Sequence, residues 1–110
     1  MKTYKEARPW GEFIRYTHNE PCTVKIITVK DGEQLSLQFH NKRSEFWRVL
    51  TDGGELIIDN TTYTGKRDAE YFIPIGTTHQ VKGPMQFLEI ATGDFDESDI
   101  VRLEDKYNRK

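Results

Sequence analysis

Short runs of β-branched and aromatic residues, separated by turn signals, follow one another along most of the chain. Threonine, isoleucine and valine number 25 of the 110 residues, whereas alanine and leucine number nine, and this balance favours pleated, half-buried backbone over helix. The predicted strand runs are residues 23–30, 34–40, 45–51, 55–59, 70–74 and 85–92. Their spacing predicts an all-β fold, either a β-sandwich or a small barrel.

One helix is predicted, near the C-terminus. Ile100, Leu103 and Tyr107 stand at i, i+3 and i+7 with charged residues between them, which is the spacing of one helix face. An edge strand is the alternative for this segment. Nothing along residues 1–110 resembles a linker long enough to separate domains, so we expect one small domain.

Charge and cysteine content exclude several classes of function. The 16 basic and 18 acidic residues are mixed along the chain, which disfavours nucleic acid and anionic membranes as partners. No apolar run approaches the roughly 18 residues that a membrane span needs, and residues 1–6 lack the apolar part of a signal peptide, so a cytoplasmic location is expected. Cys22 is the single cysteine, so any metal must be bound by histidine, carboxylate or amide groups.

Residues 34–40 alternate polar and apolar side chains. As a strand, this run places Gln34, Ser36, Gln38 and His40 on one face, which would ordinarily be the solvent face. Glu45 follows five residues after His40, and His79 comes just after a proline-glycine turn that can aim it inward. A plausible N₂O₂ metal site therefore consists of Gln38, His40, Glu45 and His79.

These spacings resemble the two motifs of the cupin superfamily. Gly32, Gln38, His40 and Glu45 fit the first motif, with glutamine at a position where histidine is commoner. Residues 74–79 fit the second motif, which runs proline, any residue, glycine, two residues and histidine. The resemblance implies a single-domain cupin, a jelly-roll barrel, that holds one divalent metal ion.

The match is closer to one cupin family, the type II phosphomannose isomerase domain that is usually fused behind mannose-1-phosphate guanylyltransferases. It covers nearly the whole chain, and glutamine as the first ligand is itself typical of that family. The stretches that carry it are residues 8–11, residues 24–25 with 27–30, residues 35–40 with Arg43, Glu45 and Trp47, and residues 99–102 with 104–105 and Tyr107. The chain departs from the family pattern at Ile26, Asn41, Phe46 and Ala91, and these departures suggest that the pocket has lost polar groups.

The resemblance implies a metal-dependent interconversion of mannose 6-phosphate and fructose 6-phosphate, in which a proton moves between C2 and C1 through an enediolate. Arg43 matches the motif arginine and is expected to bind the phosphate or the developing oxyanion. Lys25 and Glu89 match family positions on predicted strands and are the candidates for the proton shuttle. Strand parity alone does not decide which of the two points into the barrel.

Other metals and other functions fit the same ligand types. Zinc is favoured, although manganese, iron, cobalt and nickel also accept two histidines, one carboxylate and one amide. A non-catalytic module that binds a sugar or sugar phosphate is the alternative function, and a metal-dependent dioxygenase is a further one.

Two kinds of partner are expected. A barrel of this size has exposed edges and little core, so we expect a homodimer in which strands or tails exchange, with residues 8–10 as the candidate segment. The resemblance also implies a separate mannose-1-phosphate guanylyltransferase as a partner, besides the small sugar phosphate.

Overall fold

The computed structural model describes residues 3–93 and 98–107, and these ranges contain eleven strands and no helix. No helix that could span a membrane is therefore present in them. The strands are β1 (Tyr4–Arg8), β2 (Gly11–Arg15), β3 (Cys22–Val29), β4 (Leu37–Phe39), β5 (Arg43–Val49), β6 (Glu55–Ile58), β7 (Thr61–Thr64), β8 (Glu70–Ile73), β9 (His79–Lys82), β10 (Met85–Gly93) and β11 (Val101–Glu104). The predicted all-β class is confirmed.

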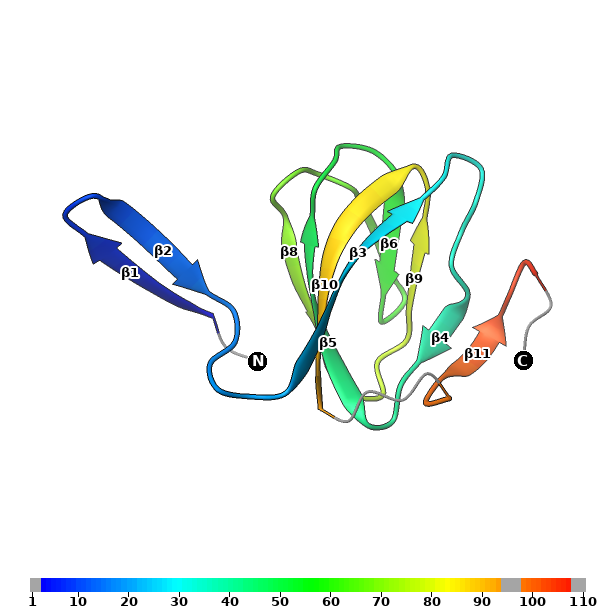
Figure 1. The fold of residues 1–110 in the computed structure, drawn as a ribbon. Helices are drawn as coiled ribbons and strands as arrows, with labels where there is room; N and C mark the ends of the chain where they lie inside the picture. The colour runs from blue at the N-terminus through cyan, green and yellow to red at the C-terminus, as the bar shows by residue number, and fades with distance from the viewer. Residues whose placement is uncertain (1–2, 94–97, 108–110) are drawn as a thin grey trace.

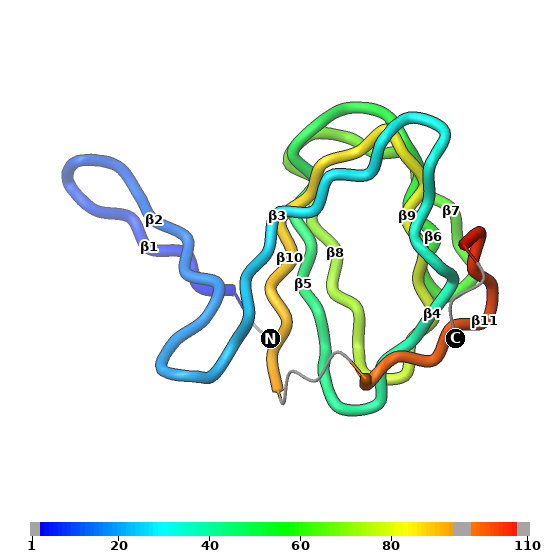
Figure 2. Tube along the Cα trace, turned by 45° about the vertical axis from the view of Figure 1, so that its right-hand side comes forward, coloured from blue at the N-terminus to red at the C-terminus, as the bar shows by residue number. Residues whose placement is uncertain are grey.

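Two antiparallel sheets face each other and curl into a barrel (Figures 1 and 2). One sheet has the strand order β3-β10-β5-β8, and the other has the order β11-β4-β9-β6-β7. In β10, alternate residues point into the barrel, as the period of two of a strand requires: Met85, Phe87, Glu89 and Ala91 are all buried.

The interior changes from apolar to polar along the barrel. At one end a closely packed core is formed by Val29, Trp47, Val49, Leu56, Ile73, Val81, Met85 and Phe87. Further along the same strands, charged side chains face the interior: Glu89 lies opposite Lys25, and Glu45 lies opposite Ala91. The apolar end supplies most of the buried area that stabilises the fold, and the polar end is free to form a site.

The C-terminal helix prediction is wrong, and the edge-strand alternative is correct. Val101–Glu104 forms β11, which pairs antiparallel with β4. Leu103 and Tyr107 remain exposed, so their helical spacing did not mark a face that packs against the core. Pairing with β4 satisfies backbone groups that would otherwise lie on an open sheet edge.

Strands β1 and β2 form a hairpin that projects from one side of the barrel (Figure 1). They pair with each other and join neither of the two barrel sheets. The hairpin is stabilised by its own contacts: the guanidinium of Arg15 lies 4.6 Å from the ring centre of Tyr4, and Lys5 forms an ion pair with Glu12. Its tip carries Trp10, whose surface is 73% exposed.

Candidate metal centre

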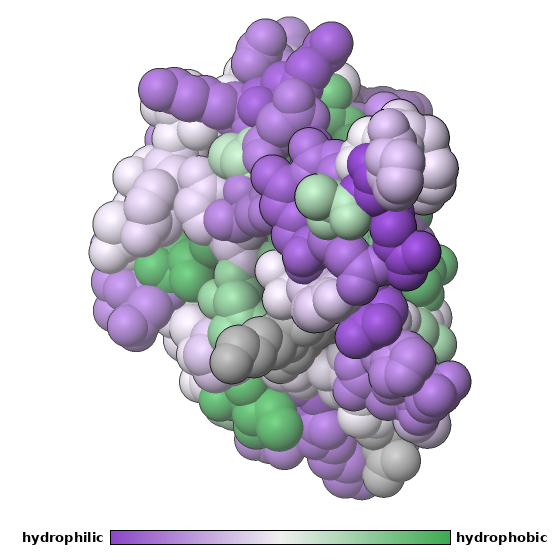
Figure 3. Space-filling view, turned by 90° about the vertical axis from the view of Figure 1, so that its left-hand side faces the viewer, coloured by the Kyte–Doolittle hydropathy of each residue, from purple (hydrophilic) through white to green (hydrophobic). Residues whose placement is uncertain are grey.

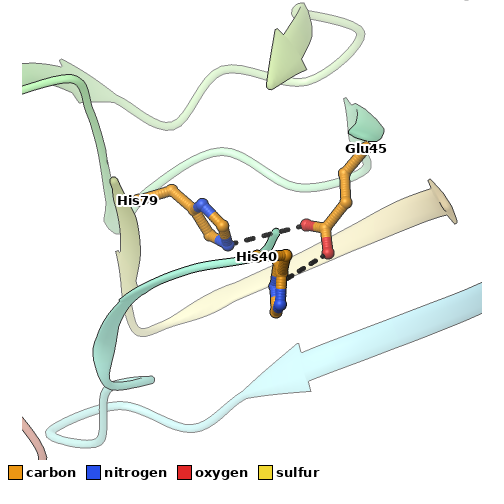
Figure 4. Close-up of side chains that lie close together, drawn as sticks. All are labelled: His40, Glu45 and His79. Atoms are coloured by element: carbon orange, nitrogen blue, oxygen red, sulfur yellow. Dashed lines mark ion pairs between the residues drawn. The ribbon is translucent and has the colours of Figure 1, made fainter. Parts of the chain in front are cut away.

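Two histidines and a glutamate meet at the polar end of the barrel (Figure 4). His40 follows β4, Glu45 lies on β5 and His79 begins β9, and all three are buried. Nε2 of His40 is 3.2 Å from Oε2 of Glu45, and Nε2 of His79 is 3.7 Å from Oε1 of the same carboxylate. One ligand atom from each residue lies within 4.8 Å of the others, which is close enough for a single ion to contact all three.

Backbone carbonyls fix the orientation of both imidazole rings. Nδ1 of His40 lies 2.6 Å from the carbonyl oxygen of Asp99, and Nδ1 of His79 lies 2.9 Å from that of Thr77. Because a carbonyl oxygen can only accept, each Nδ1 must donate its proton, and Nε2 is the atom turned toward Glu45. Histidine ligands of metal ions are usually held in this way.

Nε2 of His79 is a buried polar atom without a hydrogen-bond partner among the described residues. Burial lowers the pKa of His79, so its neutral form, with a lone pair on Nε2, is favoured. Burying a polar atom without a partner is costly, and a bound cation would remove that cost. The donor set of two imidazoles and one carboxylate therefore fits a divalent metal ion.

The carboxylate of Glu45 is held in its charged form. Burial alone would raise its pKa, but hydrogen bonds, chiefly the one with His40, and nearby positive charge outweigh burial and lower the pKa to about 2. The indole N–H of Trp47 also donates to Oε1 of Glu45 at 3.0 Å. An ionised, oriented carboxylate between two imidazoles is the form that a metal ligand requires.

Gln38, the fourth predicted ligand, and Arg43 lie beside the cluster. Gln38 on β4 is in register with His79 on β9, so the two side chains are neighbours on the same face of the sheet. Oε1 of Gln38 accepts a hydrogen bond of 2.6 Å from the hydroxyl of Ser36, and an amide oxygen has a second lone pair for another contact. Arg43 is buried, with Nε 3.3 Å from Oε2 of Glu45 and Nη2 3.3 Å from Nε2 of His40.

Asp99 holds the turn that carries His40, a role that its sequence position does not predict. Its Oδ1 accepts the N–H of Asn41 at 2.9 Å and its Oδ2 accepts the N–H of Lys42 at 2.8 Å, while its backbone carbonyl accepts Nδ1 of His40. The hydrogen bonds from the backbone N–H groups lower the pKa of the Asp99 carboxyl, and the one from Asn41 has the larger effect. An acidic residue 59 positions away offers no local signal of this contact.

A cavity of about 290 Å³ opens beside the cluster. It is lined by Lys25, Ile27, Leu35, Ser36, Gln38, Arg43, Glu45, Glu89, Ile100 and Arg102. Both proton-shuttle candidates are among them, so Lys25 and Glu89 point inward as a cross-strand pair. Burial raises the pKa of Glu89 to about 7, and the negative charge of Glu45 adds to the rise.

None of the four departures from the family pattern is among the residues that line the cavity. Ile26 is 62% exposed on the outer face of β3, and Phe46 packs its ring 5.1 Å from that of Tyr16 on the outer face of β5. Asn41 is exposed in the turn after His40. Ala91 alone of the four faces inward on a barrel strand, opposite Glu45, so the expected loss of polar groups from the pocket is wrong for Ile26 and Phe46.

Relatives of known name match almost the whole chain. It is 36% identical over 107 residues to mannose-1-phosphate guanylyltransferase ManC of Salmonella typhimurium, covering 93% of this chain and 22% of that protein. It is 36% identical over 110 residues to xanthan biosynthesis protein XanB of Xanthomonas campestris, covering 96% of this chain and 24% of the relative. The chain thus spans less than a quarter of the length of either relative.

Solved structures share the fold at low sequence identity. A variant of Streptomyces PAC13 with uridine has a TM-score of 0.68 at 18% identity, covering 84% of this chain and 78% of that one. A cupin protein from Bacteroides fragilis has a TM-score of 0.58 at 14% identity, covering 77% of this chain and 90% of that one. The family model "Mannose-6-phosphate isomerase C-terminal" matches residues 1–105. This chain, a cupin barrel, therefore belongs to the mannose-6-phosphate isomerase C-terminal family.

Proposed function

We propose that this domain holds one divalent metal ion, with zinc favoured, through His40, Glu45, His79 and Gln38, and that it interconverts mannose 6-phosphate and fructose 6-phosphate. The observation that carries the proposal is the buried His40–Glu45–His79 cluster beside a cavity that Glu45 lines. The same cavity is lined by an acid, Glu89, and a base, Lys25. The family match and the name of the guanylyltransferase relatives support the substrate class. A bound ion would act as a Lewis acid toward the sugar oxygens.

Glu89 is the residue that we assign to the movement of the carbon-bound proton. Its carboxylate takes the proton from C2 of the open-chain aldose, and the electron pair passes toward the C1 carbonyl to give an enediolate. Its carboxylic acid then returns the proton to C1 while the proton of the C2 hydroxyl passes to the C1 oxygen, which leaves the ketose with its carbonyl at C2. A pKa near 7 suits both steps, because a group of that pKa accepts and releases a proton with similar ease at neutral pH.

Arg43 and Lys25 stabilise the charge that develops during this transfer. Arg43 lies against Glu45 and His40, so its guanidinium is placed beside the end of the sugar that reacts. Lys25 is in register with Glu89, and its ammonium group donates hydrogen bonds without accepting them. Lys25 therefore steadies the ionised carboxylate of Glu89 and the enediolate beside it.

The test of this function is an NMR time course of mannose 6-phosphate with protein that is stripped of metal and then reloaded with Zn²⁺, Mn²⁺ or Co²⁺. Fructose 6-phosphate should form only with the reloaded protein.

In the same assay, Arg43→Ala should lower turnover about 100-fold or more while its metal content stays unchanged, because one charge-stabilising donor is lost. Loss of the metal from Arg43→Ala would instead make Arg43 a structural residue. Binding without turnover in the unmutated protein would identify a binding module.

We also propose that the domain forms a homodimer through the β1–β2 hairpin. Apolar patches lie among polar side chains on the side that carries the hairpin (Figure 3). Trp10 at its tip is exposed, and so are Val24 and Ile26 on the outer face of the edge strand β3. A lone two-stranded hairpin is marginally stable in water, so covering β3 of a second copy would stabilise both surfaces. A guanylyltransferase region is the further partner that the relatives suggest.

Light scattering checks the dimer. The unmutated protein should have the mass of two chains, and Trp10→Ser combined with Ile26→Glu should have the mass of one, because the substitutions remove the apolar contact and place a charge in it. Thr61→Glu, on the exposed strand β7, is the matched control and should remain dimeric. A monomeric mass for the unmutated protein at working concentration would contradict the proposal.

A further inference from the structure

Arg102 lines the cavity of the candidate site, although the sequence placed it on a predicted helix. It lies on β11 and is partly buried, with its Nε inaccessible to solvent. The register places Arg102 opposite Gln38, and Gln38 opposite His79. Arg102 therefore stands two strand spacings from His79 across one sheet, which is about 10 Å between backbones.

We propose that Arg102 binds the phosphate group of the substrate, while Arg43 serves the end of the substrate that reacts. The identity of the substrate as a sugar phosphate rests on the proposed function. An open-chain hexose 6-phosphate carries its phosphate at the opposite end from C1 and C2. A site that reacts at C1 and C2 therefore needs an anion-binding group several ångströms from the metal ligands, and the place of Arg102 meets that need.

Each of the other two cations of the cavity has an acidic neighbour near the reacting end of the site. Arg43 directs Nε to Glu45 and Nη2 to His40, both at 3.3 Å, so its guanidinium faces the cluster. Lys25 lies in register with Glu89 on the neighbouring strand. The guanidinium of Arg102 presents paired N–H donors that match two phosphate oxygens, which a single ammonium group does not.

Charge and shape of the cavity also favour an anionic ligand of this size. Three cationic and two acidic side chains line it, and a divalent metal ion would add two positive charges. Ile27, Leu35 and Ile100 supply an apolar wall for the carbon chain. A volume of about 290 Å³ lies near the lower end of the range for small-molecule sites, in keeping with a ligand the size of a hexose phosphate.

Calorimetric titration of zinc-loaded protein with fructose 6-phosphate, fructose and inorganic phosphate tests the assignment. The unmutated protein should bind fructose 6-phosphate more tightly than fructose. Arg102→Gln should weaken binding of the phosphate ester about 10- to 100-fold and leave binding of fructose unchanged, because charged hydrogen bonds to phosphate are lost. Isomerisation of the ligand during the titration does not change the comparison between variants, because both isomers carry the phosphate group.

Two further variants complete the design. Arg102→Lys keeps the positive charge but loses the paired N–H donors of the guanidinium, so its affinity for fructose 6-phosphate should lie between those of the unmutated protein and Arg102→Gln. If Arg102→Gln does not fold, Arg102→Lys still tests the assignment. Arg67→Gln, at an exposed loop arginine, is the matched control and should bind as the unmutated protein does.

The proposal is overturned if Arg102→Gln and Arg102→Lys bind fructose 6-phosphate as tightly as the unmutated protein, or if the unmutated protein does not distinguish the ester from fructose. Isomerisation with an unchanged KM in both variants would likewise overturn it and leave the proposed function standing. Binding of the ester through Arg102 without any isomerisation would support the assignment and refute the isomerase.

Discussion

Replacing His79 by alanine should release the metal ion and abolish isomerisation. His79 is almost fully buried, and its Nδ1 is held by the Thr77 carbonyl. Its Nε2 has no hydrogen-bond partner among the described residues, so this atom is available to an ion. Loss of a partner outside the ligand set typically costs 10- to 100-fold in metal affinity, so loss of a ligand should cost more than about 100-fold. Metal analysis after dialysis measures the loss, and the NMR assay measures activity.

The same substitution at His18, an exposed loop histidine, provides the control. His18→Ala should keep both metal and activity. His40→Ala should behave as His79→Ala does, because its Nε2 lies 3.2 Å from the shared carboxylate of Glu45. If His40→Ala and His79→Ala both lose the metal and still convert mannose 6-phosphate at the unmutated rate, the metal has no part in the reaction.

Glu89→Gln should lower turnover about 100- to 10,000-fold, the usual contribution of a positioned acid or base. Glutamine has nearly the same shape as glutamate and stays opposite Lys25, but it neither accepts nor returns a proton. Because substrate and metal contacts persist, metal content and KM should change little. Steady-state kinetics by NMR, together with metal analysis, separate these quantities.

Glu55→Gln, at the exposed start of β6, is the control for removal of one negative charge and should leave kcat unchanged. Full activity of Glu89→Gln would remove Glu89 from the mechanism and direct attention to Lys25. Loss of metal from Glu89→Gln would place the carboxylate among the groups that hold the ion.

The candidate metal site was predictable because its residues come from two short motifs. Gln38, His40 and Glu45 are close in sequence, and a proline-glycine turn precedes His79, so local geometry alone restricts where their side chains lie. The alternation of residues 34–40 left open whether the polar face of this strand points toward solvent or into the barrel. Ser36 and His40 are buried, so the polar face is the inner one.

Other parts of the site depend on register between distant strands. A shift of one residue moves a side chain from one face of a strand to the other, so the inward pairing of Lys25 with Glu89 and the outward position of Ile26 required the sheet itself. Arg102 was hidden for the same reason, because its segment has a helical spacing and becomes a strand only by pairing with β4.

The N-terminal hairpin shows a different limit of prediction from sequence. Its strands, β1 and β2, carry charged residues on both faces and bury no core, so they lack the alternation by which strands are recognised. Strands β7 and β9 were also missed, since β7 is exposed throughout and β9 follows directly on the turn that ends in His79.

Proton exchange in heavy water tests the central claim most directly. Mannose 6-phosphate would be incubated in D₂O with metal-loaded protein, metal-free protein and metal-loaded Glu89→Gln, and followed by NMR. With the metal-loaded unmutated protein we expect formation of fructose 6-phosphate and replacement of the C2 proton of mannose 6-phosphate by deuterium. Neither change is expected in the other two samples. A folded, metal-loaded protein that leaves the C2 proton in place and forms no ketose would contradict this claim.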